Sequence, residues 1–245
     1  MPRLPRLGTD PTAFPPLEAA FDEPNGLLAM GGDLQPARLL AAYRRGVFPW
    51  YEEGQPILWW SPDPRVVFDT AGFRLPRKLR ATLPALGWSL RADSAFAEVM
   101  DRCAAPRPGQ DGTWIGPSMR AAYVGLHALG HAHSVEVFEG DALVGGIYGV
   151  AVGRMFFGES MFSARSNGSR LALAALARTL AGWGWPLLDA QVDNPHLRLL
   201  GARAMPRPAF ASAIAALVDQ PGRVGNWREA FGERPVAWLA AAPGD

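Results

Sequence analysis

The sequence has little cysteine and no long hydrophobic run. Cys103 is the only cysteine among 245 residues, so a disulfide within the chain is impossible and a reducing, cytoplasmic location is favoured. No stretch of eighteen apolar residues occurs, which excludes a transmembrane helix. The N-terminal segment, MPRLPRLGTDPTAFPP, lacks the apolar centre of a secretory signal peptide. We therefore expect a cytoplasmic protein that makes no membrane contact.

An excess of one charge sign is also lacking. The chain has 24 Lys and Arg against 23 Asp and Glu, which gives a formal net charge of +1. This balance excludes a strongly basic coat for nucleic acid, but it permits a local basic patch. The densest basic cluster, Arg74, Arg77, Lys78 and Arg80, has two interpretations, a solvated helix face or a patch that binds phosphate.

The chain does contain enough apolar sequence for a sizeable core, since 49% of its residues are hydrophobic. Residues 1–26 are rich in proline, and we expect them to be extended. The Ser-Pro-Asp-Pro segment at 61–64 interrupts regular structure. It marks the expected boundary between a small N-terminal domain, residues 1–63, and a larger domain, residues 64–245.

Hydrophobic periodicity predicts an α+β fold. A helix is expected from Pro36, which fits a first turn, to Gly46, which fits a C-terminal stop. Three strand-like runs with short turns between them predict an antiparallel meander, and a long helix and a short strand follow, so we expect a mixed sheet. The remaining predicted helices lie within 76–83, 94–104, 117–130 and 169–185, and the predicted strands are 133–139, 143–153, 154–162 and 186–192.

Glu159 is unexpected where it stands, in the middle of the apolar segment RMFFGESMFS. An unpaired carboxylate in apolar surroundings is costly and often shifts its pKa or becomes protonated. One interpretation is a local ion pair, for example with Arg154, or a turn that brings Glu159 to the surface. The other is a carboxylate at the bottom of a cleft that receives a cation of a ligand.

Asp189 and Gln191 stand two residues apart on the predicted strand PLLDAQV. The period of a strand places both on one face, with Leu188 and Ala190 on the other. Two polar side chains on one face of an interior strand suggest either a cleft or hydrogen bonds to neighbouring loops.

Several other motifs are weaker. His127, His131 and His133 lack the carboxylate of an HExxH metal site, so we expect no metal. The segment GESMF lacks the second glycine of a nucleophile elbow, which argues against a serine hydrolase. Trp50 and Trp114 stand in turn-like sequences where exposed rings would stack on bases or cover a peptide.

Five blocks together resemble the leucyl/phenylalanyl-tRNA–protein transferase family. They are GLLAMGGDLQPARLLAAYRRGVFPWY, ILWWSPDPR, HSVEVFEG, LVGGIYGVAVGRMFFGESMFS and LLDAQV with HLRLLGA, in the same order from about Phe14 to Phe210. The resemblance implies a bacterial cytosolic enzyme that moves Leu, Phe or Met from a charged tRNA to the N-terminal Lys or Arg of a protein, which marks it for degradation. It also implies a small N-terminal domain, a larger domain with the N-acetyltransferase (GNAT) fold, and no cofactor.

The resemblance also implies roles for individual residues. Glu159 would pair with the cationic N-terminal residue of the acceptor. Asp189 and Gln191 would form the catalytic centre, with Asn194 orienting Asp189. If Phe156 and Glu159 both line the cleft, Gly158 must bend the strand, because strict alternation separates them. Residues expected to contact the aminoacyl side chain are Ile147, Phe156, Leu176, Leu180 and Leu188. Other expected contacts are Tyr43, Trp50 and Trp114 with substrate, and Arg77, Lys78 and Arg80 with tRNA.

Two alternatives belong to other functional classes. The segment RSNGSR, residues 165–170, resembles the pyrophosphate loop of acetyl-CoA-dependent acetyltransferases, but Arg170 replaces the small residue expected last. A tRNA-binding module without catalysis would use Arg77 and Lys78 on phosphate, but it would leave Glu159, Asp189 and Gln191 unexplained.

Overall fold

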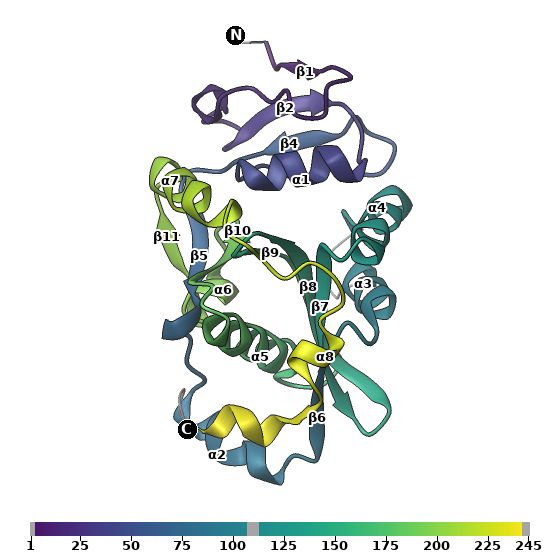
Figure 1. Ribbon diagram of the computed structural model, residues 1–245, viewed down its shortest axis with the longest axis vertical. Helices are drawn as coiled ribbons and strands as arrows, with labels where there is room; N and C mark the ends of the chain where they lie inside the picture. The colour runs from purple at the N-terminus through teal and green to yellow at the C-terminus, as the bar shows by residue number, and fades with distance from the viewer. Residues whose placement is uncertain (1–2, 107–112, 242–245) are drawn as a thin grey trace.

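Two β-sheets make up the framework of the protein. The computed structural model describes residues 3–106 and 113–241, with the smaller sheet at one end of the long axis (Figure 1). The smaller sheet has the strand order β1-β2-β4-β3, and the helix α1, Pro36–Arg44, packs beside it (Figure 1). Its strands are Arg6–Leu7, Leu27–Gly31, Leu58–Trp60 and Phe48–Pro49.

The larger sheet is mixed, as the sequence predicts. Its strand order is β11-β5-β10-β9-β8-β7-β6-β12, and within the described part of this sheet β9 and β10 pair in parallel whereas its other pairs are antiparallel. The β7–β8–β9 meander is confirmed. Strands β5 and β6 were not anticipated, because five-residue runs without clear alternation resemble loops. The strands, in sheet order, are Arg203–Met205, Arg65–Asp69, Leu187–Gln191, Met155–Ser163, Ala142–Val152, Ala132–Glu139, Trp88–Ala92 and Arg234–Pro235.

Helices cover both faces of this sheet. On one face lie α3, Phe96–Ala104, and α4, Pro117–Ala128, and on the other lies α5, Gly168–Gly182 (Figure 1). These three helices, α1 and α2 were all predicted from the sequence and are confirmed. The shorter elements are α2, Arg77–Thr82; α6, Pro195–Leu199; α7, Arg207–Val218; α8, Arg228–Phe231; and 3₁₀ turns at Leu17–Ala19, Thr70–Gly72, Leu83–Ala85 and Val236–Ala240.

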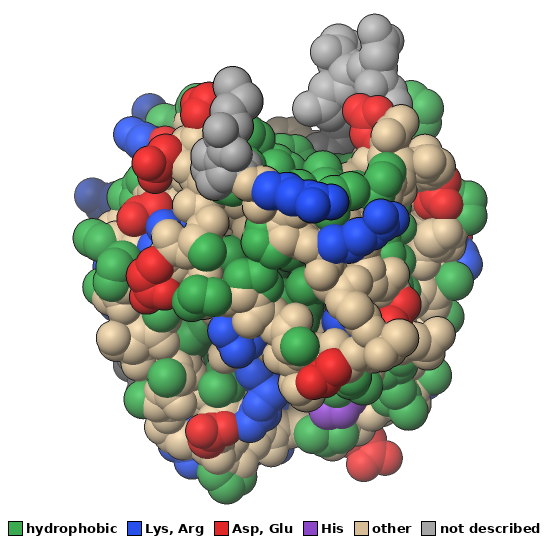
Figure 2. Space-filling view, turned by 90° about the horizontal axis from the view of Figure 1, so that it is seen from above, with side chains coloured by type: hydrophobic (Ala, Val, Ile, Leu, Met, Phe, Trp, Pro, Cys, Tyr) green, Lys and Arg blue, Asp and Glu red, His purple; other side chains and the backbone are tan. Residues whose placement is uncertain are grey.

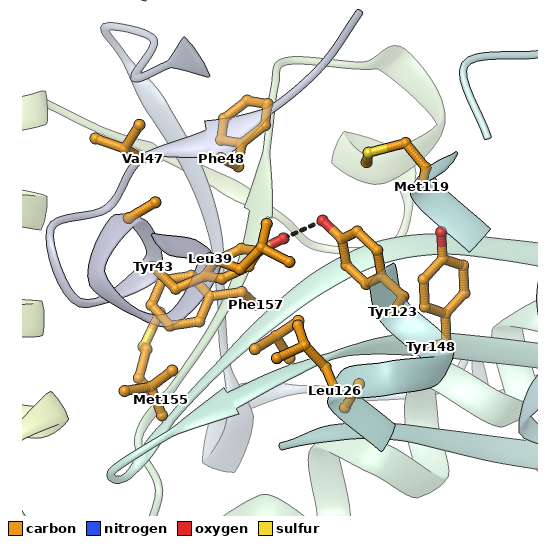
Figure 3. Packing of buried hydrophobic residues seen from close by; sticks show 14 of the residues in the cluster. Leu39, Tyr43, Val47, Phe48, Met119, Tyr123, Leu126, Tyr148, Met155 and Phe157 are labelled. Carbon is orange, nitrogen blue, oxygen red and sulfur yellow. Dashed lines mark hydrogen bonds between the residues drawn. The ribbon is translucent and has the colours of Figure 1, made fainter. Parts of the chain in front are cut away.

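The N-terminal sheet shares a hydrophobic core with the larger sheet. Tyr43 of α1 packs against Phe157 of β9 (Figure 3). Trp59 belongs to the same buried cluster as Tyr123 of α4. A second cluster lies between the other face of the sheet and α5. The small domain is therefore fixed against the strands that carry the polar residues Glu159 and Gln191. None of the described helices is long and apolar enough to cross a membrane.

The surface around the N-terminal sheet carries both charge signs. Lys and Arg side chains alternate there with Asp and Glu and with hydrophobic groups (Figure 2). This face shows no uniform basic coat, in agreement with the balanced composition of the sequence.

Candidate active site

A cleft with a volume of about 750 Å³ opens between the N-terminal sheet and the adjacent strands β9 and β10. Phe48 and Trp50 of the small domain form one wall, and the start of α6 forms another. The polar side chains Glu159, Gln191 and Asn194 line it. Five of the residues singled out in the sequence therefore line one cavity: Trp50, Trp114, Glu159, Gln191 and Asn194.

Glu159 stands at a β-bulge of β9 and faces this cleft. Gly158 pairs with Gly149 and Ser160 pairs with Tyr148, so Glu159 has no partner on β8. An extra residue of this kind interrupts strict alternation and redirects a side chain. Phe156, two residues before Gly158, stays buried in the core beneath α5. The bulge directly after Gly158 does not bring both side chains into the cleft, because Glu159 and Phe156 stay on opposite faces of β9.

Three neutral groups surround the Glu159 carboxyl. Tyr43 Oη lies 2.7 Å from Oε1, Tyr123 Oη lies 3.1 Å from Oε2, and Gln191 Nε2 donates to Oε1 at 2.8 Å. Tyr43 and Tyr123 also hydrogen-bond to each other (Figure 3). No Lys or Arg of the described residues pairs with Glu159, so the ion pair with Arg154 is not formed.

These surroundings change the acidity of the site. Burial raises the pKa of Glu159 to about 8, and the charge of Asp189 adds to this, whereas the hydrogen bonds from Tyr43, Tyr123 and Gln191 act in the opposite direction. Burial and the neighbouring Glu159 also raise the pKa values of Tyr43 and Tyr123 well above the usual value. The cleft therefore holds a carboxyl group whose pKa is raised to about 8 and which pairs with no Lys or Arg of the described residues.

Asp189 is held in a buried ion pair. Arg65 Nε and Nη2 donate to Asp189 Oδ1 and Oδ2 at 2.8 and 2.6 Å, and both side chains are fully buried. Arg65 Nη1 donates to the carbonyl of Gly46 at 2.9 Å, and the guanidinium lies between the rings of Phe48 and Phe210. Such a bidentate pair fixes the carboxylate in one orientation.

Gln191 departs from regular strand geometry, which corrects the prediction that it shares an open face with Asp189. Its φ is 63°, and the register with β5 shifts between Asp189 and Gln191. The Gln191 amide N–H donates to Asp189 Oδ1 at 2.9 Å, and its side chain reaches Glu159. Asp189 thus faces Arg65 inside the protein, and Gln191 alone of this pair presents its side chain to the large cleft.

Asn194 does not orient Asp189, which is a second correction. Its Oδ1 accepts from the amide of His196 at 2.7 Å and caps the start of α6. Asparagine is among the residues that cap helices best, because its side-chain oxygen satisfies a free amide. Arg65, which was not predicted from the sequence, orients Asp189. No local signal could have found it, since Arg65 is 124 residues away in the chain.

A small apolar pocket of about 70 Å³ adjoins Glu159. Of the five residues predicted to form such a pocket, Ile147 and Leu188 line it. Phe156, Leu176 and Leu180 do not line it and are buried in the same hydrophobic cluster. The pocket is also lined by residues that were not predicted from the sequence: Phe68, Met161, Leu173 and Leu197. Of these, Leu173 had a signal, since it shares a face of α5 with the two predicted leucines.

Two models of known protein families match the chain. Residues 67–215 match the family model described as leucyl/phenylalanyl-tRNA protein transferase, and residues 32–63 match the model of its N-terminal domain. The chain belongs to this transferase family. Proteins named leucyl/phenylalanyl-tRNA–protein transferase are similar to it over nearly their whole length. The relative from Xanthomonas euvesicatoria is 60% identical and covers 95% of this chain and 94% of its own.

Two further relatives carry the same name. The protein of Xanthomonas oryzae pv. oryzae strain MAFF 311018 is 61% identical, with 95% of this chain and 94% of its own covered. The protein of Xylella fastidiosa strain M23 is 57% identical, with coverage of 92% and 93%. A solved structure, L-PGS from Bacillus licheniformis, aligns with 66% of this chain and 55% of its own chain, with a TM-score of 0.38 and 10% identity.

In this member of the transferase family, the predicted aromatic contacts lie at the cleft, but Tyr43 does not. Trp50 is 42% exposed and stacks obliquely on Trp60 at 5.7 Å, and Trp114 is half-buried; both line the cleft. Tyr43 is fully buried behind Glu159. Any effect of Tyr43 on a ligand in the cleft therefore passes through the Glu159 carboxyl.

The predicted basic patch lies on α2, at the end of the molecule opposite the N-terminal sheet (Figure 1). Arg77 and Lys78 are exposed, and Arg80 is partly buried. At the start of α5, the amide of Ser169 donates to Ser163 Oγ at 2.8 Å, and Arg170 donates to Asn167. The segment that resembles an acetyltransferase pyrophosphate loop thus already directs one of its amides to an internal acceptor.

Proposed function

We propose that the chain joins Leu, Phe or Met from an aminoacyl-tRNA to the N-terminal Arg or Lys of an acceptor protein, which marks that protein for degradation. The family supplies the reaction, transfer of an aminoacyl group from tRNA to a protein. One observation in the cleft supports the proposal most directly. Gln191 donates a 2.8 Å hydrogen bond to Glu159, and no Lys or Arg of the described residues pairs with the Glu159 carboxyl.

The chemistry is aminolysis of an ester. The neutral α-amine of the acceptor attacks the carbonyl carbon of the aminoacyl ester, a C–N bond forms, and the bond to the ribose oxygen breaks. One proton of the amine leaves nitrogen, and the departing ribose oxygen takes up a proton. An activated ester needs no ATP for this step, so placement of the amine beside the carbonyl accounts for much of the acceleration.

Gln191 is proposed to hold the attacking amine. Its Nε2 donates to Glu159, which leaves Oε1 on the other side of the amide to accept an N–H of the amine. Asp189 is proposed as a positioning residue and not as the group that takes the proton, because Arg65 and the Gln191 amide already bind its carboxylate. The left-handed backbone of Gln191 is stabilised through that carboxylate.

Glu159 is proposed to bind the basic side chain of the acceptor. A desolvated carboxyl that pairs with no Lys or Arg of the described residues favours an incoming guanidinium or ammonium. An acceptor seated on Glu159 has its α-amine near Gln191, because the two side chains touch. The same geometry therefore selects the acceptor and positions its nucleophile.

The donor is proposed to occupy the rest of the cleft. The apolar pocket beside Glu159 suits a Leu, Phe or Met side chain, and it discriminates among them by only ~1–3 kcal/mol per methylene. Trp50 and Trp114 offer faces on which the terminal adenine can stack. Arg77, Lys78 and Arg80 are proposed to contact phosphates of the tRNA body, at a distance from the reacting ester.

Fold and location are proposed to follow the same family. The meander β7–β9, followed by α5 and by β10 parallel to β9, supports a GNAT-type arrangement in residues 64–245. The end of one sheet at Trp60 and the start of the other at Arg65 support a boundary near residue 63. A charged tRNA is a cytoplasmic substrate, which supports a cytoplasmic location.

The test is transfer of labelled leucine from leucyl-tRNA to a peptide that begins with Arg. We expect a labelled peptide product, and no product from the same peptide with an acetylated α-amine, since it lacks the nucleophile. Acetyl-CoA should not acetylate the peptide. Acetyl-CoA turnover without leucine transfer would contradict the proposal and favour an acetyltransferase. Binding of tRNA without any transfer would favour a binding module.

A further inference from the structure

We infer that recognition of the acceptor exchanges a proton for a cation: Glu159 is protonated in the empty cleft and loses this proton when the basic side chain of the acceptor binds. The inference rests on the proposed role of Glu159 as the acceptor-binding carboxyl. It goes beyond that role because it assigns the protonation state of Glu159 before binding and the release of a proton on binding.

The inference is based on the number of hydrogen atoms available to a closed ring of hydrogen bonds among Tyr43, Tyr123 and the Glu159 carboxyl. Tyr43 Oη contacts Glu159 Oε1, Tyr123 Oη contacts Glu159 Oε2, and the two hydroxyl groups contact each other (Figure 3). Each oxygen–oxygen contact needs one hydrogen between its atoms. The two phenols supply only two hydrogens for three contacts, and the third must be a carboxyl proton on Glu159.

The remaining contact of Glu159 indicates which oxygen carries the proton. Oε1 accepts from Gln191 Nε2 at 2.8 Å and lies 2.7 Å from Tyr43 Oη, so it serves as the carbonyl oxygen. Oε2 then carries the proton and donates to Tyr123 at 3.1 Å. Tyr123 donates to Tyr43, and Tyr43 donates to Oε1. In this arrangement each of the two hydroxyl groups gives one hydrogen bond and receives one.

The groups that face Glu159 favour the same state. Asp189 on β10 is negative, and its partner Arg65 is fully engaged with it and with Gly46. Tyr148 on β8 is fully buried, and its hydroxyl has no partner among the described residues. Burial raises the pKa of Glu159 to about 8, which agrees with the proton count. The other titratable groups that touch the Glu159 carboxyl or line its cleft are Tyr43 on α1, Tyr123 on α4, His196 on α6 and Arg102 on α3, the last paired with Glu98 at 3.2 Å.

Binding then proceeds with balanced charge. The guanidinium or ammonium of the acceptor keeps its own protons, the O–H bond of Glu159 breaks, and that proton passes to the solvent. Tyr123 is then free to donate to the carboxylate, at the expense of its contact with Tyr43. Because a proton leaves on binding, a lower pH weakens the binding of basic acceptors.

The test is a proton count by titration calorimetry at pH 7, in buffers with different ionisation enthalpies. The wild-type protein is titrated with two peptides that differ only in the first residue, Arg or the uncharged norleucine, so that any change at the α-amine cancels. With a pKa near 8, we expect the Arg peptide to release about 0.9 proton more than the norleucine peptide. In Glu159→Gln this excess should disappear, because the amide has no proton to release.

A kinetic measurement provides an independent readout. The ratio of KM for the Arg peptide to KM for the norleucine peptide should fall about 30-fold between pH 6.5 and pH 9. Equal proton release by the two peptides, or a ratio that does not change with pH, would overturn the exchange. If leucine is still transferred to the Arg peptide, that result leaves the proposed function intact. Failure of the Arg peptide to bind or to accept leucine would overturn both.

Discussion

Two carboxyl groups on the same sheet both have a pKa raised by desolvation, yet different groups surround them. Glu136 on β7 is fully buried, and Ser134 and Ser94 donate to its two oxygens at 2.5 and 2.9 Å. Burial raises its pKa to about 7. Glu159 on β9 has a pKa of about 8 and opens on the cleft. A perturbed pKa therefore does not by itself mark a functional residue.

The local geometry separates the two cases. Glu136 lies in regular pairing opposite Gly146 and Arg91, and the groups that bind it come from adjacent parts of the fold. Glu159 occupies a bulge, and the phenols that bind it come from α1 and α4, far away in the sequence. We interpret Glu136 as a residue of the fold and Glu159 as a residue of the reaction.

The largest expected effect comes from the buried Arg65–Asp189 ion pair, whose carboxylate accepts a hydrogen bond from Gln191 of the cleft. Arg65→Met leaves Asp189 buried without a partner, and it should destabilise the protein by ~3–5 kcal/mol. Arg65→Lys keeps the charge but loses the bidentate fork, so Gln191 should move and kcat should fall roughly 100-fold. Thermal unfolding and single-turnover transfer rates measure these effects separately.

A matched control makes the Arg65 experiment decisive. Arg203→Lys alters an exposed bidentate pair with Asp69 on the same strand, β5, and should change neither quantity greatly. If Arg65→Lys folds and keeps the wild-type kcat, Asp189 does not position Gln191, and the proposed centre is wrong.

The second effect tests the comparison directly. Glu159→Gln should lower kcat/KM for a peptide that begins with Arg by about 30-fold, the low end of the ~2–5 kcal/mol lost when one partner of a desolvated charge pair is removed. Glu136→Gln keeps the shape of a group far from the substrate and should change this ratio less than about twofold. Steady-state kinetics with Arg and norleucine peptides measure both variants.

Two outcomes would contradict the assignment. An equal loss for both peptides in Glu159→Gln, together with a lower melting temperature, would make Glu159 a residue of the fold. A selective loss for the Arg peptide in Glu136→Gln would mean that the serine-bound carboxyl is coupled to the cleft.

The smallest expected effect is on the pH dependence of stability. The pKa of Glu136 rises from 4.5 to about 7 on folding, so its favourable contribution is fully present below pH 4.5 and is lost as the pH rises through 7. Glu159 acts in the same direction up to about pH 8. Glu136→Gln should therefore reduce, by a few degrees, the drop in melting temperature between pH 5 and pH 8.

Melting curves of the wild-type protein, Glu136→Gln and Glu159→Gln across this range distinguish the two groups. The Glu159 variant should remove the part of the drop that extends above pH 7. An identical pH profile in all three proteins would show that neither carboxyl gains its proton on folding.

Much of the framework follows from local sequence. Proline in the first turn and glycine at the end define α1, and alternating apolar runs with glycine turns define the β7–β9 meander. These signals act within a few residues, so a single sequence is enough to read them. The same holds for Glu159, whose position in an apolar strand is unusual in any fold.

Only the tertiary structure decided how the site is assembled. Period-two alternation put Asp189 and Gln191 on one face, but a left-handed Gln191 separates them, because Arg65, 124 residues earlier, draws Asp189 into the interior. Tyr123 reaches Glu159 only because α4 packs on the sheet beside α1. The sequence by itself determined most of the longer elements, the family and the residue types; long-range packing decided which of the side chains meet, since neither a buried ion pair nor a ring of hydrogen bonds is encoded by neighbours in the chain.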